Sequence, residues 1–130
     1  MDVQELAARE AIRDTIARYA QFADGGRFAE LAELFTDDGV LEIAGEAPIR
    51  GREAIEGFLG AVKERLAGSG MPARIRHHVS SVRIDLAGED EASAASYFLV
   101  VSDRGPDHWG RYRDTLRRVG DHWLFHERKV

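Results

Sequence analysis

The chain lacks cysteine, has few prolines and contains no long run of apolar residues. Its 130 residues include Cys 0 and Pro 3. Without cysteine there are no disulfides, thiolate metal sites or cysteine nucleophiles, and a reducing cytoplasm is the simplest location. No apolar stretch approaches the roughly 18 residues of a membrane span. The acidic start, Met1-Asp2-Val3-Gln4-Glu5, does not have the layout of a signal peptide. We therefore expect a cytoplasmic protein with no membrane partner.

Positive charge is also in short supply. The chain carries 18 Lys+Arg against 23 Asp+Glu, a formal net charge of −5. Nucleic-acid binding needs a basic surface, so we expect no nucleic-acid partner. The hydrophobic content of 44% and charged content of 32% are typical of a globular protein. The length suits one hydrophobic core and is too short for two, so we expect a single domain over residues 1–130.

Several catalytic and metal-binding motifs are missing as well. There is no G-x-S-x-G nucleophile motif and no G-x-x-x-x-G-K phosphate loop. Of the five histidines, His77 and His78 are adjacent and would face opposite sides of a strand. His122 and His126, if both lie on one strand, would be about 13 Å apart, too far to share an ion. We predict no metal and no cofactor.

An amphipathic helix pattern opens the chain and runs into a carboxylate and two glycines. One apolar stripe recurs at helical spacing, and Gly25 is the residue type that ends helices in the left-handed conformation. Asp24 would then lie in the last turn, where the helix dipole disfavours a carboxylate by roughly 0.3–1 kcal/mol. Either Asp24 bonds a backbone N–H in the following turn, or it faces a partner across a pocket. The stripe consists of Ile12, Ile16, Tyr19, Ala20 and Ala23.

The rest of the first half predicts two more helices and a short strand. A short helix is expected over 27–35, stopped by the turn-forming residues 36–39, and a strand over 40–44. The segment 49–51 leads into a third helix, whose apolar stripe is the most regular in the chain. Gly57 and Gly60 lie inside it, and we expect close packing against them. The stripe is Ile55, Phe58, Leu59, Val62 and Leu66, and Gly68-Ser69-Gly70-Met71-Pro72 ends the helical half.

The second half has the period-two pattern of long strands joined by short turns. Strands are expected over 73–86, 92–102, 108–119 and 122–130, and such short connections favour an antiparallel meander. In the first strand the apolar parity switches near Ser80-Ser81, which predicts a bulge and a curled sheet. The predicted fold is α+β: a curved antiparallel sheet, forming a half-barrel, with three N-terminal helices that enclose a pocket.

The order and spacing of these features resemble the SnoaL-like branch of the nuclear-transport-factor-2-like superfamily. The resemblance spans nearly the whole chain and implies a cone-shaped α+β barrel around an apolar pocket. It also implies a homodimer formed through the outer sheet face, and a small apolar or aromatic ligand. The residues that carry it are Tyr19-Ala20, Asp24-Gly25-Gly26-Arg27, Leu34-Phe35, Asp38-Gly39-Val40, Gly51, Ile55, Phe58, Arg76-His77-His78-Val79-Ser80, Gly110-Arg111-Tyr112-x-Asp114, Trp123 and Arg128.

The resemblance also implies a catalytic pair. In the dehydratase and dehydrochlorinase branches, an Asp just after the first helix orients a His early on the first long strand, and the His acts as the base. Asp24 and His77 occupy those places here. A neutral imidazole is a competent base near neutral pH, and a carboxylate on its other nitrogen fixes the tautomer. The competing interpretation makes His77 a hydrogen-bonded core residue.

Four further residues are candidates for substrate binding. The resemblance implies that Arg128, on the last strand, helps a leaving anion, that Tyr112 and Asp114 face the pocket, and that Tyr19 enters from the first helix. Three of the four have an alternative role. Tyr19 could be a wall residue, Asp114 could only form an ion pair with Arg111 or Arg128, and Arg128 could belong to a solvated charge cluster. His78 is expected on the outer face.

Two functions remain open from the sequence. The first is a cofactor-independent lyase, isomerase or polyketide cyclase in which His77, oriented by Asp24, abstracts a proton. The second is a non-catalytic domain that binds a small hydrophobic ligand or resembles a dioxygenase small subunit. Fold alone does not decide between them, although the His-Asp pair favours an enzyme.

Overall fold

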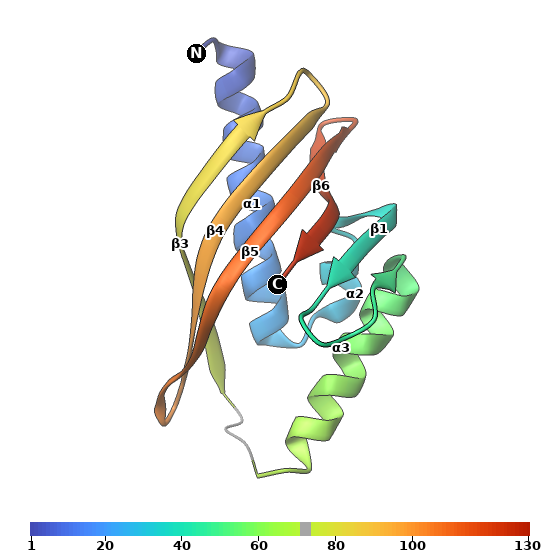
Figure 1. Cartoon of the computed structure of the whole chain (residues 1–130), viewed down its shortest axis with the longest axis vertical. Coiled ribbons are helices and arrows are strands. Elements are labelled where there is room, and N and C mark those ends of the chain that lie inside the picture. Colours follow the sequence, from blue (N-terminus) through green and yellow to red (C-terminus); the bar gives the residue numbers. More distant parts are fainter. Residues whose placement is uncertain (71–73) are drawn as a thin grey trace.

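The computed structural model describes residues 1–70 and 74–130, in which helices precede a long-stranded curved sheet (Figure 1). The predicted turn residues Met71 and Pro72 and the predicted strand start at Ala73 lie outside the described residues. The elements are α1 (Val3–Gly25), α2 (Phe28–Ala32), β1 (Phe35–Glu42), β2 (Ile49–Arg50), α3 (Arg52–Ala67), β3 (Ile75–Leu86), β4 (Glu91–Ser102), β5 (Gly105–Val119) and β6 (His122–Lys129).

The described strands form one six-stranded sheet in the order β2-β1-β6-β5-β4-β3. Strands β3 to β6 are an antiparallel meander, as predicted. β1 pairs with β6 in parallel, so the sheet is mixed and not antiparallel throughout. The sheet curves around α1, with β2 and β3 at its two edges (Figure 1). The expected α+β half-barrel with N-terminal helices is confirmed.

Helix α1 forms for the reasons that the sequence indicated. The Asp2 side chain caps its start by accepting from the Glu5 backbone N–H at 2.8 Å. The predicted stripe is buried from Ile12 to Ala20. Its left-handed terminator is Gly26, with φ 69°, and not Gly25, so the helix is one residue longer than predicted. Asp24 still lies in the last turn.

The predicted second helix is too long, and the predicted first strand begins too late. Helix α2 ends at Ala32, and β1 starts at Phe35. The polar residues 36–39, predicted to form a turn, belong to β1, where the register with β6 shifts between Phe35 and Val40. Phe35 before these residues and Val40 after them both pair with β6, and this distant pairing holds the segment between them in the strand despite its local turn preference.

Helix α3 is less buried than its regular stripe suggested. Ile55 is fully buried, while Leu66 is 43% exposed. The prediction of close packing at Gly57 and Gly60 is wrong, because a Cβ at either position would meet no atom of the described residues within 4 Å. The helix buries one narrow strip against β1, β2 and α2.

The predicted bulge in β3 is present. The register between β3 and β4 shifts between Ser80 and Arg83, and Ser81 has a φ of 53°. The buried face therefore changes parity, so His77 and Val79 before the bulge face the same side as Ile84 after it. This bend curls the sheet towards α1 and brings β3 against that helix.

Candidate active site

Asp24 and His77 are in direct contact across α1 and β3. The Asp24 Oδ1 lies 2.6 Å from the His77 Nδ1, and the His77 backbone N–H donates to both carboxylate oxygens at 3.0 and 3.2 Å. The two side chains are 10% and 14% exposed. With Nδ1–H held by a carboxylate, the Nε2 of a neutral His77 is an acceptor. Asp24 therefore has its partner on β3, and not in the turn after α1.

Local structure explains why this carboxylate stands at a helix C-terminus. The position costs Asp24 some interaction with the helix dipole, but three hydrogen bonds from His77 offset that cost. These contacts hold Asp24 in one position against the His77 imidazole.

Phe98 and Tyr112 form an aromatic surface beside His77. The Phe98 ring centroid lies 6.3 Å from that of His77 and is stacked on Tyr112 at 4.6 Å. Gly110 makes this possible, because a Cβ there would lie 2.7 Å from the Phe98 Cζ. Phe98 was not singled out from the sequence, although its parity with the buried residues of the same strand indicated an inward position.

Arg128 and Asp114 form a fully buried ion pair. The Arg128 Nε and Nη2 donate to the two Asp114 oxygens at 2.8 and 3.2 Å, and both side chains are 0% exposed. The Arg128 guanidinium lies over the rings of Tyr112, Tyr19 and Phe125 at 3.6, 4.2 and 4.4 Å. The interpretation of Arg128 as part of a solvated cluster is therefore wrong. Among the two cations considered for Asp114, the structure selects Arg128.

Burial governs the protonation of this cluster. It raises the pKa of Tyr19 and Tyr112, so both hydroxyls stay protonated and can donate hydrogen bonds at neutral pH. Burial also raises the pKa of Asp114, and the Arg128 guanidinium opposes that rise. Because an arginine stays charged in proteins, the ionisation of the pair depends on Asp114 alone.

Two buried polar atoms near this cluster have no hydrogen-bond partner among the described residues. They are the Arg128 Nη1 and the Ser96 Oγ. A buried donor without a partner costs about 1–3 kcal/mol, so each is a place where water or a ligand oxygen would bind favourably. Ser96 was missed from the sequence; its signal was a polar residue on the buried parity of a strand.

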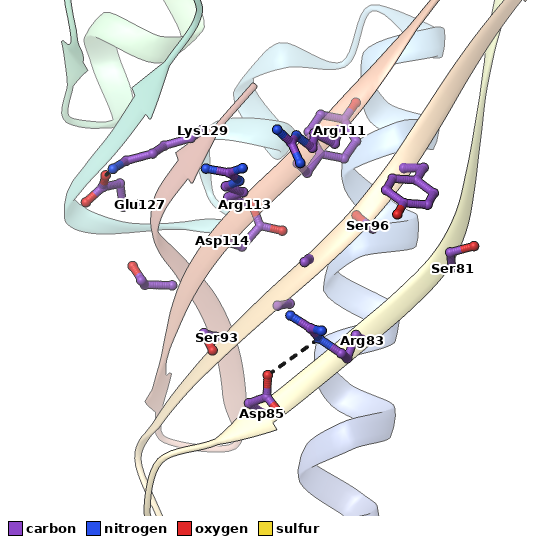
Figure 2. Close-up of a pocket in the computed structure, with 15 residues that line it drawn as sticks. Ser81, Arg83, Asp85, Ser93, Ser96, Arg111, Arg113, Asp114, Glu127 and Lys129 are labelled. Atoms are coloured by element: carbon purple, nitrogen blue, oxygen red, sulfur yellow. Dashed lines mark ion pairs between the residues drawn. The ribbon is translucent and has the colours of Figure 1, made fainter.

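One surface hollow lies on the opposite face of the sheet from the Asp24–His77 pair. Figure 2 shows this groove on strands β3 to β6, with α1 behind them. It has a volume of about 730 Å³, and its charged lining includes Arg83, Arg111, Arg113, Lys129, Asp85 and Glu127. A second hollow of about 560 Å³ borders the start of α1. Asp24 and His77 line neither, so contacts, not a cavity, define the candidate site.

The remaining histidines do not join this site as metal ligands. Across residues 1–70 and 74–130 there is no group of three His, Cys, Asp or Glu side chains that could hold a metal ion. His78 is exposed, as expected. His126 lies on β6, with its Nδ1 3.6 Å from the Oδ1 of Asp38 on the neighbouring strand β1. No helix in the described part of the chain is long and apolar enough to span a membrane.

A family model, a related sequence and solved structures all match most of this chain. The family model described as a SnoaL-like domain matches residues 4–129. A steroid Δ-isomerase of Nocardioides simplex is 35% identical over 99 residues, which cover 75% of this chain and 70% of the relative. A proposed scytalone dehydratase of Novosphingobium aromaticivorans superposes with a TM-score of 0.82 at 27% identity, covering 99% of this chain and 86% of its own.

A third relative was solved with a small molecule bound. This protein of Catenulispora acidiphila, in complex with S-DNPA, superposes with a TM-score of 0.80 at 31% identity. The match covers 95% of this chain and 91% of that one.

Proposed function

Because the chain belongs to the SnoaL-like domain family, we propose that it is a cofactor-independent enzyme of the isomerase, dehydratase or cyclase type, acting on a small apolar or aromatic carbonyl compound. The observation that carries the proposal is the 2.6 Å contact between the Asp24 carboxylate and the His77 imidazole. Both side chains are at most 14% exposed, so this pair is shielded from solvent, unlike a His–Asp pair on the surface. A shielded pair of this kind is suited to general base catalysis.

In the proposed first step, the His77 Nε2 removes a proton from a carbon next to a carbonyl group. The C–H bond breaks, its electron pair forms an enolate, and His77 becomes an imidazolium that the Asp24 carboxylate stabilises. Return of that proton from His77 to another carbon completes an isomerisation. Its transfer to a departing β-hydroxyl, which leaves as water, completes a dehydration. Attack of the enolate carbon on a second carbonyl, whose oxygen takes the proton, completes a cyclisation.

The buried cluster would stabilise the enolate oxygen. Tyr19 and Tyr112 offer protonated hydroxyls, and the Arg128 Nη1 is a cationic donor without a protein partner among the described residues. Asp114 fixes the guanidinium through two hydrogen bonds and so acts as a positioning residue. Fixed donors in a site that excludes water are the largest single contribution in many enolisation reactions.

Replacement of the base tests the proposal. A Δ5-3-keto steroid and a β-hydroxy aryl ketone serve as substrates, with formation of the conjugated product followed by ultraviolet absorbance. We expect His77→Gln to lower kcat/KM by about 10²–10⁴ and Asp24→Asn to lower it less, because the imidazole stays in place. His122→Gln, at an exposed histidine that begins β6, is the control and should keep the wild-type rate.

Two outcomes would contradict this proposal. One is full activity in His77→Gln. The other is binding of both compounds, seen as thermal stabilisation that Asp24→Asn leaves unchanged, without any turnover by the wild type. The second outcome would instead support a ligand-binding or dioxygenase-small-subunit-like domain.

We also propose a cytoplasmic homodimer of single-domain chains, paired through the outer sheet face. Tyr97, Leu99 and Trp109 are 58%, 40% and 83% exposed there, on neighbouring strands β4 and β5. Large apolar side chains grouped on one face are typical of protein interfaces.

A further inference from the structure

A second His–carboxylate pair stands on β5. The His108 Nδ1 lies 2.6 Å from the Asp107 Oδ2. Adjacent residues of a regular strand point to opposite faces, so this contact needs an irregularity. The irregularity is a bulge: Val100 pairs with His108, but Val101 pairs with Pro106, which leaves Asp107 without a partner on β4. Bulges often re-aim a side chain beside a functional site.

His108 lies in one cross-strand row with His77. Val100 of β4 pairs with His77 on one side and with His108 on the other. The two histidines are therefore two strand spacings apart, about 10 Å. They share a face, because His108 has the parity of the buried Tyr112 and Asp114.

Phe98 links the two histidines. Its ring centroid lies 6.3 Å from that of His77 and 5.9 Å from that of His108, in a T-shaped contact with the latter. The ring can occupy this position because Gly110, its partner on β5, has no side chain. Phe98 thus forms an apolar floor with one His–Asp pair at each end.

The two pairs differ in their access to solvent. The His77 side chain is 14% exposed, whereas that of His108 is 58% exposed. The sheltered histidine suits the base of the proposed reaction. The exposed one suits recognition of a polar group at the outer end of a ligand, where Asp107 holds the imidazole in one orientation for hydrogen bonding.

We propose that His108, oriented by Asp107, is a specificity-determining residue that binds an oxygen at the far end of a fused-ring substrate whose near end lies at His77. The inference rests on the proposed function and narrows its substrate class. A flat ring system with oxygens at opposite ends spans most of the distance between the histidines. A compound with one oxygen would use only the His77 end.

Binding of two naphthols to the full chain tests this inference. The probes are 2-naphthol, with one oxygen, and 2,6-dihydroxynaphthalene, with an oxygen at each end, and Kd is measured by titration calorimetry. We expect the wild type to prefer the diol by about tenfold, the effect of one additional hydrogen bond. His108→Leu should abolish the preference by weakening binding of the diol. Asp107→Asn should reduce it.

The control is His122→Leu, at the start of β6 and paired with Val119 at the far end of β5, which should keep the tenfold preference. The inference is overturned if the wild type shows no preference, or if His108→Leu retains it. Those results leave the proposed function standing as long as His77→Gln still abolishes turnover. If neither naphthol binds the wild type, the inference is overturned, and turnover of the two carbonyl substrates then decides the proposed function separately.

Discussion

At the scale of single residues, the most consequential feature is a charge pair with no solvent contact. Removing one partner of a buried pair leaves an uncompensated charge, which costs about 3–5 kcal/mol. Arg128→Met should therefore lower the free energy of unfolding by about that amount, by leaving the Asp114 carboxylate alone. Urea denaturation at pH 7 measures the change.

The double variant Arg128→Met/Asp114→Leu separates pairing from packing. We expect it to be more stable than Arg128→Met alone, because no charge is left buried without a partner. If the losses in unfolding free energy of the two single variants simply add in the double variant, the Arg128–Asp114 pair does not contribute to stability in the way that its geometry implies.

The residues of the candidate site were predictable to different degrees. The proximity of Asp24 and His77 followed from the helix ending, the strand parity and the family resemblance. The surroundings of Arg128 did not follow, because Glu127-Arg128-Lys129 has the local composition of a solvated cluster. Its burial depends on Asp114, one strand away, and on three rings from α1, β5 and β6. Asp107 and His108 were equally hidden, since only a bulge brings their side chains together.

At the scale of elements, replacing two glycines by alanine is expected to change stability in opposite directions. A Cβ at Gly110 would meet the Phe98 ring at 2.7 Å, so Gly110→Ala must displace the floor beside His77. We expect a loss of about 1–3 kcal/mol of stability and weaker binding of 2-naphthol. Gly57, in α3, has open space around it, and Gly57→Ala should raise stability by about 0.5–1 kcal/mol. Thermal and urea unfolding of both variants check the signs.

An unchanged or stabilised Gly110→Ala would show that Phe98 can move at no cost. Gly57→Ala, on a different element, shows what the same substitution does where nothing is displaced.

Elements with strong local patterns were predicted well, and those set by distant pairing were not. The α1 stripe could be located from helical spacing of apolar residues, and the β3 bulge from a switch in apolar parity. The start of β1 could not, because its turn-forming residues lie between Phe35 and Val40, which pair in parallel with a strand far along the chain, β6. Two-residue β2 likewise exists only as a partner of β1.

At the scale of the whole molecule, the outer sheet face is the surface that the fold leaves uncovered. Helix α1 protects the inner face, while the outer one carries the groove of Figure 2 and the exposed rings of Tyr97 and Trp109. In a two-fold dimer this patch would meet itself, and Arg111 and Arg113 would leave net positive charge on both sides, since Arg83 and Lys129 pair with Asp85 and Glu127. Salt should screen that repulsion, and we expect the proposed dimer to tighten as ionic strength rises.

Trp109, 83% exposed, is the residue whose change should separate the subunits. A central tryptophan typically contributes at least about 2 kcal/mol to an interface, so Trp109→Glu should weaken dimerisation by roughly 30-fold or more. Analytical ultracentrifugation over a range of protein concentrations measures the dissociation constant. Leu66→Glu on α3, a comparable change at a 43% exposed residue away from the sheet, should leave it unchanged. A wild type that is monomeric at every concentration, or a Trp109→Glu variant that dimerises like the wild type, would rule out the outer face as the interface.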